Sequence, residues 1–285
     1  MRFTRLVLYD IQQGLLKKWK WCIGILLMNF GFCLAFLIKT VAYNKGAAFD
    51  HKISPVTPTF GDAVFYIFAG MSEYVPMPDQ PFKMPFIWLL LYIVLFWMTL
   101  EYANNDLTSS GQQLLIRTKG RTLWWLSKCV WNFFCVLVFF ILVWGETLLF
   151  CILQGFKVSL SLHATFLSSI IGSSLDGSGY LFPLLLCLFV ITPLVMYALS
   201  MLQMVLTLWL KPIVSYAITI GILILSAYIF SPSFIGNYAM PVRNAAFVEG
   251  GVNGTVGLWF AAALIVISVI IGVFRFRKYD ILPVE

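Results

Sequence analysis

The sequence predicts an all-α polytopic membrane protein, with six transmembrane helices, an N-terminal amphipathic interfacial helix and both termini cytoplasmic. Of the 285 residues, 61% are hydrophobic and 11% are charged, whereas about 25% of the residues of a soluble domain are charged. A soluble fold of this length cannot cover so much apolar surface, so a soluble enzyme is excluded. The apolar stretches are long and unbroken, which favours spanning helices over the short alternating strands of a barrel.

Six stretches meet the length of about 20 mostly apolar residues that a crossing requires. The predicted spans are residues 21–41, 84–102, 123–153, 180–210, 213–230 and 256–274. The third and fourth are longer than a perpendicular crossing needs, so we expect them to tilt, kink or project from the membrane. Pro193 predicts a kink in the fourth. No connecting loop could hold a soluble domain, so residues 1–285 form a single transmembrane domain.

The net charge of +7 indicates which side of the membrane faces the cytoplasm. It does not indicate a nucleic-acid-binding surface. Most of the Lys and Arg residues lie before the first span, between the second and third spans, and after the last. Positive residues gather on the cytoplasmic side of membrane proteins. With six crossings, this asymmetry places both termini in the cytoplasm.

Residues 1–20 precede the first span and contain both apolar and polar residues. Apolar side chains recur at every fourth position, at Phe3, Val7, Ile11, Leu15 and Trp19. This spacing predicts an amphipathic helix lying in the cytoplasmic interface. A soluble helix packed on another subunit is the alternative.

Two of the loops predicted on the outer side of the membrane, opposite the cytoplasm, also contain apolar segments. Residues 60–70 are too few to span and too apolar for a free loop, so we expect a re-entrant or interfacial helix. Residues 162–171 predict a short surface helix.

The six Cys lie in or beside the spans, and the two His, His51 and His163, lie in the outer connections. The sequence therefore predicts no catalytic residue, no metal site and no cofactor bound directly by this chain.

Two carboxylates stand out within the spans. Glu146 lies deep in the third span, where a charge costs about 2.5–3.5 kcal/mol. It either lines a translocation path or a subunit seam, or fixes helix packing through a hydrogen bond, for example with Thr147 or Asn132. Glu101 ends the second span; it either braces the following loop by pairing with Lys128 or a nearby Arg, or is a solvated helix-end charge.

The cytoplasmic loop at residues 104–122 has helix-capping residues at its start, a short amphipathic stretch, and a turn at Gly120. From composition alone, a plain basic loop explains it. Its sequence pattern, however, resembles the loop between the second and third spans of ABC-2 type transporter permeases. That pattern is Leu114-Leu115-x-Arg117-Thr118-x-x-Arg121-x-x-Trp124-Trp125-x-x-Lys128.

The resemblance implies a partnership with a cytoplasmic ATPase. In that family two permeases pair, as a homodimer or heterodimer, and a loop helix of each couples to an ATP-binding cassette ATPase. Residues 1–20 would be the family's interfacial elbow helix. The coupling residues carried over to this chain are Gln112, Leu114, Leu115, Arg117, Lys119 and Arg121. The chain has no GxxxxGK[ST] phosphate loop, so ATP and Mg²⁺ would bind to the partner ATPase and this chain would not be an enzyme.

The expected function is therefore that of an exporter subunit in a bacterial plasma membrane, moving a hydrophobic or amphipathic substrate such as a peptide. Its partners would be the ATPase, a second permease and membrane lipid, with no nucleic acid. A secondary transporter is the alternative, although it would normally show paired broken spans or several intramembrane ionisable groups. An intramembrane enzyme would need clustered His, Asp, Glu or Ser, which the sequence lacks.

Overall fold

The computed structural model is helical throughout the part of the chain that it describes, apart from loops and two isolated β-bridges. The described residues are 3–49, 54–76, 81–100, 102, 121–175 and 181–277. The α-helices are α1 (Phe3–Gly14), α2 (Trp19–Phe49), α3 (Phe60–Phe68), α4 (Phe86–Leu100), α7 (Arg121–Leu153), α8 (Ala164–Ile171), α9 (Leu181–Leu186), α10 (Thr192–Leu206), α11 (Pro212–Tyr228) and α12 (Gly254–Arg277).

Four helical stretches are long and apolar enough to cross a membrane. They are Trp19–Ala47, Arg121–Leu153, Leu181–Leu206 and Gly254–Arg275. These stretches cover the first, third, fourth and sixth predicted spans. Helices α4 and α11, in the places of the second and fifth, are apolar but only 15 and 17 residues long.

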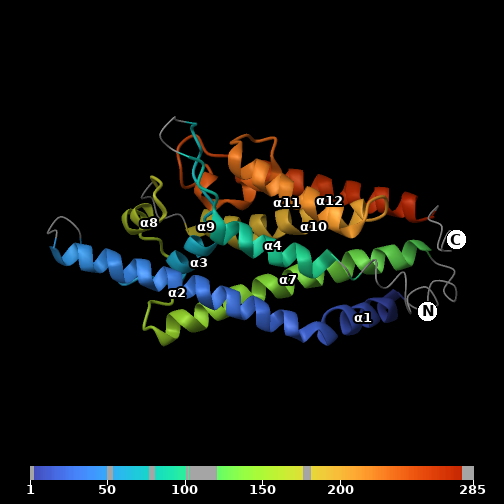
Figure 1. The fold of residues 1–285 in the computed structure, drawn as a ribbon, viewed down its shortest axis with the longest axis horizontal. Helices are drawn as coiled ribbons and strands as arrows, with labels where there is room; N and C mark the ends of the chain where they lie inside the picture. The colour runs from blue at the N-terminus through green and yellow to red at the C-terminus, as the bar shows by residue number, and fades with distance from the viewer. Residues whose placement is uncertain are drawn as a thin grey trace.

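The long helices lie side by side along one axis of the molecule (Figure 1). One end, the α1 end, holds α1, the start of α7 and the last turn of α12, where Arg121 Nη1 donates to the carbonyl of Arg277 at 2.8 Å. The opposite end, the α8 end, holds α3 and α8. Helix α4 connects the two ends, since Trp88 near its start bonds the Ala239 carbonyl and Tyr102 beyond its end bonds Asp10.

A π-helical turn, Cys187–Ile191, joins α9 to α10 just before Pro193. Proline lacks the N–H that an α-helix uses at that position, and a wider turn accommodates the loss. Thr192 reinforces the turn through its hydroxyl, which donates to the Cys187 carbonyl at 2.9 Å. Where the sequence predicted a kink at Pro193, the structure has a π-turn.

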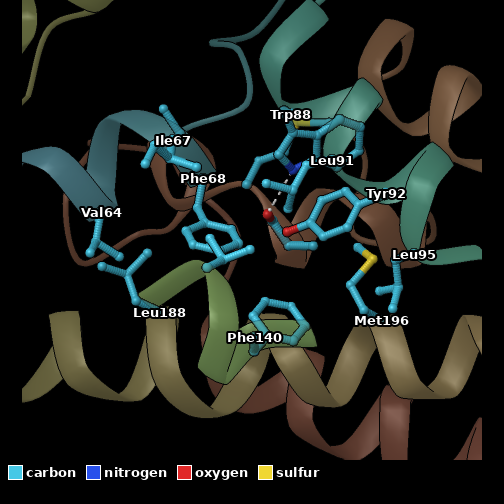
Figure 2. Close-up of a cluster of buried hydrophobic side chains, with 14 of the residues drawn as sticks. Val64, Ile67, Phe68, Trp88, Leu91, Tyr92, Leu95, Phe140, Leu188 and Met196 are labelled. Atoms are coloured by element: carbon cyan, nitrogen blue, oxygen red, sulfur yellow. Dashed lines mark hydrogen bonds between the residues drawn. The ribbon is translucent and has the colours of Figure 1, made fainter. Parts of the chain in front are cut away.

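Helix α3 is a short buried helix inserted among longer ones. Val64, Phe65, Ile67 and Phe68 are fully buried. Figure 2 shows Val64 and Phe68 pointing toward Leu188 of the π-turn and Phe140 of α7, and the rings of Phe68 and Phe140 stack at 5.5 Å. Residues 60–68 thus form a helix, as predicted, and protein surrounds it, which is how an irregular chain is tolerated at membrane depth.

Candidate functional site

A buried ion pair joins α1 to the long helix α7. Lys128 Nζ lies 2.5 Å from Asp10 Oδ1, and the two side chains are 1% and 3% exposed. Removing two charges from water is costly unless they are paired and further hydrogen-bonded. The pair is therefore a fixed connection between the two helices.

Aromatic residues complete the surroundings of this pair. The Tyr102 hydroxyl donates to Asp10 Oδ1 at 3.0 Å. The Lys128 ammonium lies 4.5 Å from the centre of the Tyr102 ring and 4.8 Å from that of Trp124. Such contacts stabilise a cation more strongly when water is excluded. Trp124 is itself buried in the protein.

The register of α1 explains why Asp10 faces inward. Its buried residues are Leu6, Asp10 and Gly14, four positions apart and therefore on one face. Gly14 lets the helix approach α7 closely, because a Cβ there would collide with the Trp131 ring. The apolar stripe predicted from Phe3, Val7 and Ile11 is only half-buried and flanks this face.

The ion pair also lies beside the proposed coupling segment. Tyr102 is the last described residue before it, and Lys128 lies in the second turn of α7 just after it. Both bond Asp10 of α1, so the two ends of the segment are tied to one helix. At the start of α7, Arg277 Nε also donates to Thr122 Oγ1 at 3.2 Å.

The structure describes only two of the residues predicted for coupling and bracing. These are Arg121, which contacts the end of α12, and Lys128, whose carboxylate partner among the described residues is Asp10. The others lie outside the described residues: Glu101, Gln112, Leu114, Leu115, Arg117 and Lys119.

Glu146 of α7 contacts α2. Asn29 Nδ2 donates to Glu146 Oε2 at 2.9 Å and lies 3.3 Å from Thr147 Oγ1. Asn29 is fully buried, whereas Glu146 is half-buried. Asn132, the other partner considered from sequence, instead accepts from Ser200 at 2.8 Å. Glu146 therefore takes part in a hydrogen-bonded contact between two long helices.

At the α8 end, Arg243 is the centre of a network of backbone contacts. Its Nη1 and Nη2 donate to the carbonyls of Ser226 and Ala227 at the end of α11, at 2.5 and 2.6 Å. Its Nε and Nη2 also donate to the carbonyls of Met71 and Ser72 after α3, and Nη1 contacts Asn237 Oδ1. Burial lowers the pKa of Arg243 to about 10, an effect that Glu73 opposes, so the guanidinium is still charged at neutral pH.

A second buried carboxylate, Asp62, organises the start of α3. It forms a capping box with Thr59: each side chain accepts from the other residue's backbone N–H, at 2.9 and 3.1 Å. Asp62 also accepts from the backbone N–H of His163, whose Nδ1 lies 2.7 Å from the same carboxylate. The carboxylate therefore fixes α3 to the connection that precedes α8.

Sequence reasoning did not single out Asp10 or Asp62. Signals for both were present. Asp10 is the one acidic residue among the first 20, and Thr59-x-x-Asp62 has the spacing of a capping box. The part of the chain that the structure describes contains no cluster of three or more His, Cys, Asp or Glu that could hold a metal.

A family model described as a protein of unknown function, DUF2705, matches residues 68–282. No curated protein and no solved structure matches the chain. The matched region runs from the end of α3 to beyond α12, and so contains α4, α7, Lys128 and Arg243, while α1 and Asp10 precede it. Since the match covers more than half of the sequence, the chain belongs to the DUF2705 family.

Proposed function

We propose that the chain is the transmembrane subunit of an ATP-binding cassette exporter of the ABC-2 type, driven by a separate ATPase. The observation that carries this proposal is the anchoring of both ends of segment 103–120. Tyr102 before it and Lys128 after it bond the same carboxylate, Asp10, on α1. A loop held in this way can transmit a movement of a cytoplasmic partner to α4 and α7 together. A free basic loop cannot transmit it.

The proposal includes six crossings, with α4 and α11 spanning alongside the four longer stretches. Both lie along the same axis as the longer helices beside them (Figure 1). They are about 22 and 26 Å long at 1.5 Å per residue, against roughly 30 Å for the hydrocarbon core. Flanking residues and local thinning of the bilayer accommodate a shortfall of this size. The α1 end then faces the cytoplasm.

The work of such a subunit is mechanical. The chain has no phosphate loop, so ATP and Mg²⁺ bind to the ATPase, whose closing and opening bias two arrangements of the helices. A second permease completes the transport path. An apolar, aromatic-rich bundle suits a hydrophobic or amphipathic substrate such as a peptide, and the Glu146–Asn29 contact braces α7 against α2.

Affinity purification from the native membrane tests the partnership directly. We expect a tagged chain to recover an ATPase that contains a phosphate loop. If the chain is recovered with no ATPase under conditions that preserve membrane complexes, the proposal is wrong.

A charge reversal at Arg121 tests the coupling role. Arg121→Glu is expected to lower substrate-dependent ATP hydrolysis in the reconstituted complex while leaving membrane insertion intact. Lys211→Glu is the matched control, because Lys211 is exposed at the same end, between α10 and α11, and outside the coupling segment. Equal rates of substrate-dependent ATP hydrolysis in the two variants would show that Arg121 has no coupling role. Arg121→Lys should stay close to the unmodified protein.

A further inference from the structure

A large cavity opens at the α8 end of the bundle. Its volume is about 940 Å³, and residues of α2, the chain after α3, the approach to α4 and the end of α8 form its walls. A second cavity of about 250 Å³ adjoins it and shares Lys39, Gly70, Pro85 and Ile171 with it. The two form one recess, which we call the α8-end recess.

Two lysines, Lys39 and Lys83, line the larger cavity. Lys39 Nζ donates to the Ile170 carbonyl at 2.7 Å, and an ammonium group has three donors, so two remain for a ligand. Glu73 also lines the cavity, but it lies close enough to the buried Arg243 to raise that residue's pKa. Arg243 balances this carboxylate, so the described residues that line the recess present two positive charges in excess.

The adjoining cavity is an apolar slot. Tyr66 and Ile67 of α3 and Phe86, Ile87 and Trp88 of α4 line it. Phe86, at the start of α4, is 68% exposed, so the slot opens at an apolar surface of the bundle. The recess therefore joins a cationic compartment to an apolar one.

The position of Lys39 on α2 gives the depth of the recess in a bilayer. Trp19 and Lys39 lie on this one helix, and the residues between them span about 30 Å at 1.5 Å per residue. This distance equals the usual thickness of the hydrocarbon core. With the exposed Trp19 at the interface of the α1 end, Lys39 reaches the headgroup layer of the opposite leaflet.

We infer that the α8-end recess binds an anionic phospholipid of that leaflet. The phosphate lies between Lys39 and Lys83, and one acyl chain enters the slot between α3 and α4. Lysine binds phosphate as a point charge, and basic pockets between membrane helices bind lipid headgroups. An acidic amphipathic peptide has similar chemistry, but a lipid is favoured because the slot opens at membrane depth. The inference does not depend on an ATPase partner.

Native mass spectrometry of the purified full chain tests the inference. The probes are dioleoylphosphatidylglycerol and dioleoylphosphatidylcholine, which share their acyl chains and differ in net charge. We expect the anionic lipid to bind at least about tenfold more tightly, and Lys83→Gln and the double variant Lys39→Gln/Lys83→Gln to lose that preference. Lys45→Gln should keep it, because Lys45 is exposed on the same helix but outside the recess.

Lys83→Glu is a second variant. It is not expected to disturb folding, because Lys83 is exposed before α4. It should bind the anionic lipid more weakly than Lys83→Gln does. Equal binding of the two lipids by the unmodified chain would overturn the inference, and so would a preference that survives in the double variant. Lysine-dependent binding of an acidic amphipathic peptide without any lipid preference would overturn it in favour of the peptide.

Discussion

Among the described residues, the buried charges lie at the two ends of the bundle, and each has a partner on a different element. Asp10 pairs with Lys128 between α1 and α7, Asp62 holds the connection before α8, and Arg243 holds the carbonyls that end α11. A buried charge without partners is strongly unfavourable. These contacts therefore specify which elements meet, a choice that apolar packing in a membrane leaves open because lipid is equally apolar.

Lys128→Met should destabilise the protein more than any loss of packing explains. It leaves the Asp10 carboxylate buried without its cation, and breaking one side of a buried pair costs about 3–5 kcal/mol. We expect a clear fall in Tm in detergent. The double variant Asp10→Asn/Lys128→Met should recover most of the loss, because Asn keeps an acceptor for Tyr102. Lys20→Met is the matched control, since Lys20 is exposed; equal Tm values for the two single variants would contradict a structural pair.

Arg243→Lys should destabilise the α8 end even though it keeps the charge. A lysine ammonium cannot reproduce the planar fork that contacts the carbonyls of Met71, Ser72, Ser226 and Ala227. Each buried acceptor left unsatisfied costs about 1–3 kcal/mol, so we expect a loss of about 3 kcal/mol in unfolding free energy. Arg5→Lys, at an exposed position of α1, should be neutral. A small loss in Arg243→Lys would mean that water replaces the missing donors.

At the scale of elements, the sequence predicted the long helices well because apolar length alone defines them. Helices α2, α7 and α12 fall where long apolar runs predicted them, and Pro193 marked the irregularity before α10. The predicted third span, 123–153, ends at the same residue as α7. Which side of a helix faces the protein was less predictable. In α1 the buried face carries Asp10 and Gly14, which an apolar periodicity does not reveal.

Gly14→Leu should separate α1 from α7. The side chain would enter the space occupied by the Trp131 ring, and overpacking of this kind typically costs about 1–3 kcal/mol. Gly24→Leu is the matched control, because a Cβ at Gly24 meets nothing within 4 Å. Since leucine favours a helix over glycine by up to about 1 kcal/mol, the control should be neutral or stabilising. Tm values that fall equally in both variants would show that α1 does not depend on this close approach.

At the scale of the whole molecule, the all-helical membrane architecture follows from composition, but its contacts do not. The apolar content and the four long stretches both predict a bundle. The burial of α3 depends on residues distant in sequence, such as Phe140 and Leu188 (Figure 2). The Asp10–Lys128 pair joins residues 118 positions apart, and no local pattern could have paired them. The coupling residues 112–119 lie outside the described part of the chain, so their role stays a prediction.

The topology predicts which added cysteines a membrane-impermeant maleimide can reach in intact cells. Five of the native cysteines are buried and Cys22 is partly buried, so background labelling should be low. With six crossings, cysteines in place of the exposed Lys45 and Lys157 should react from outside. Cysteines in place of the exposed Lys17 and Lys211 should react only after permeabilisation. If α4 and α11 did not cross, position 157 would be inside and position 211 outside, the reverse of the pattern expected here. Position 45 would remain outside and position 17 inside in both cases, so these two control for accessibility and orientation while 157 and 211 decide the number of crossings.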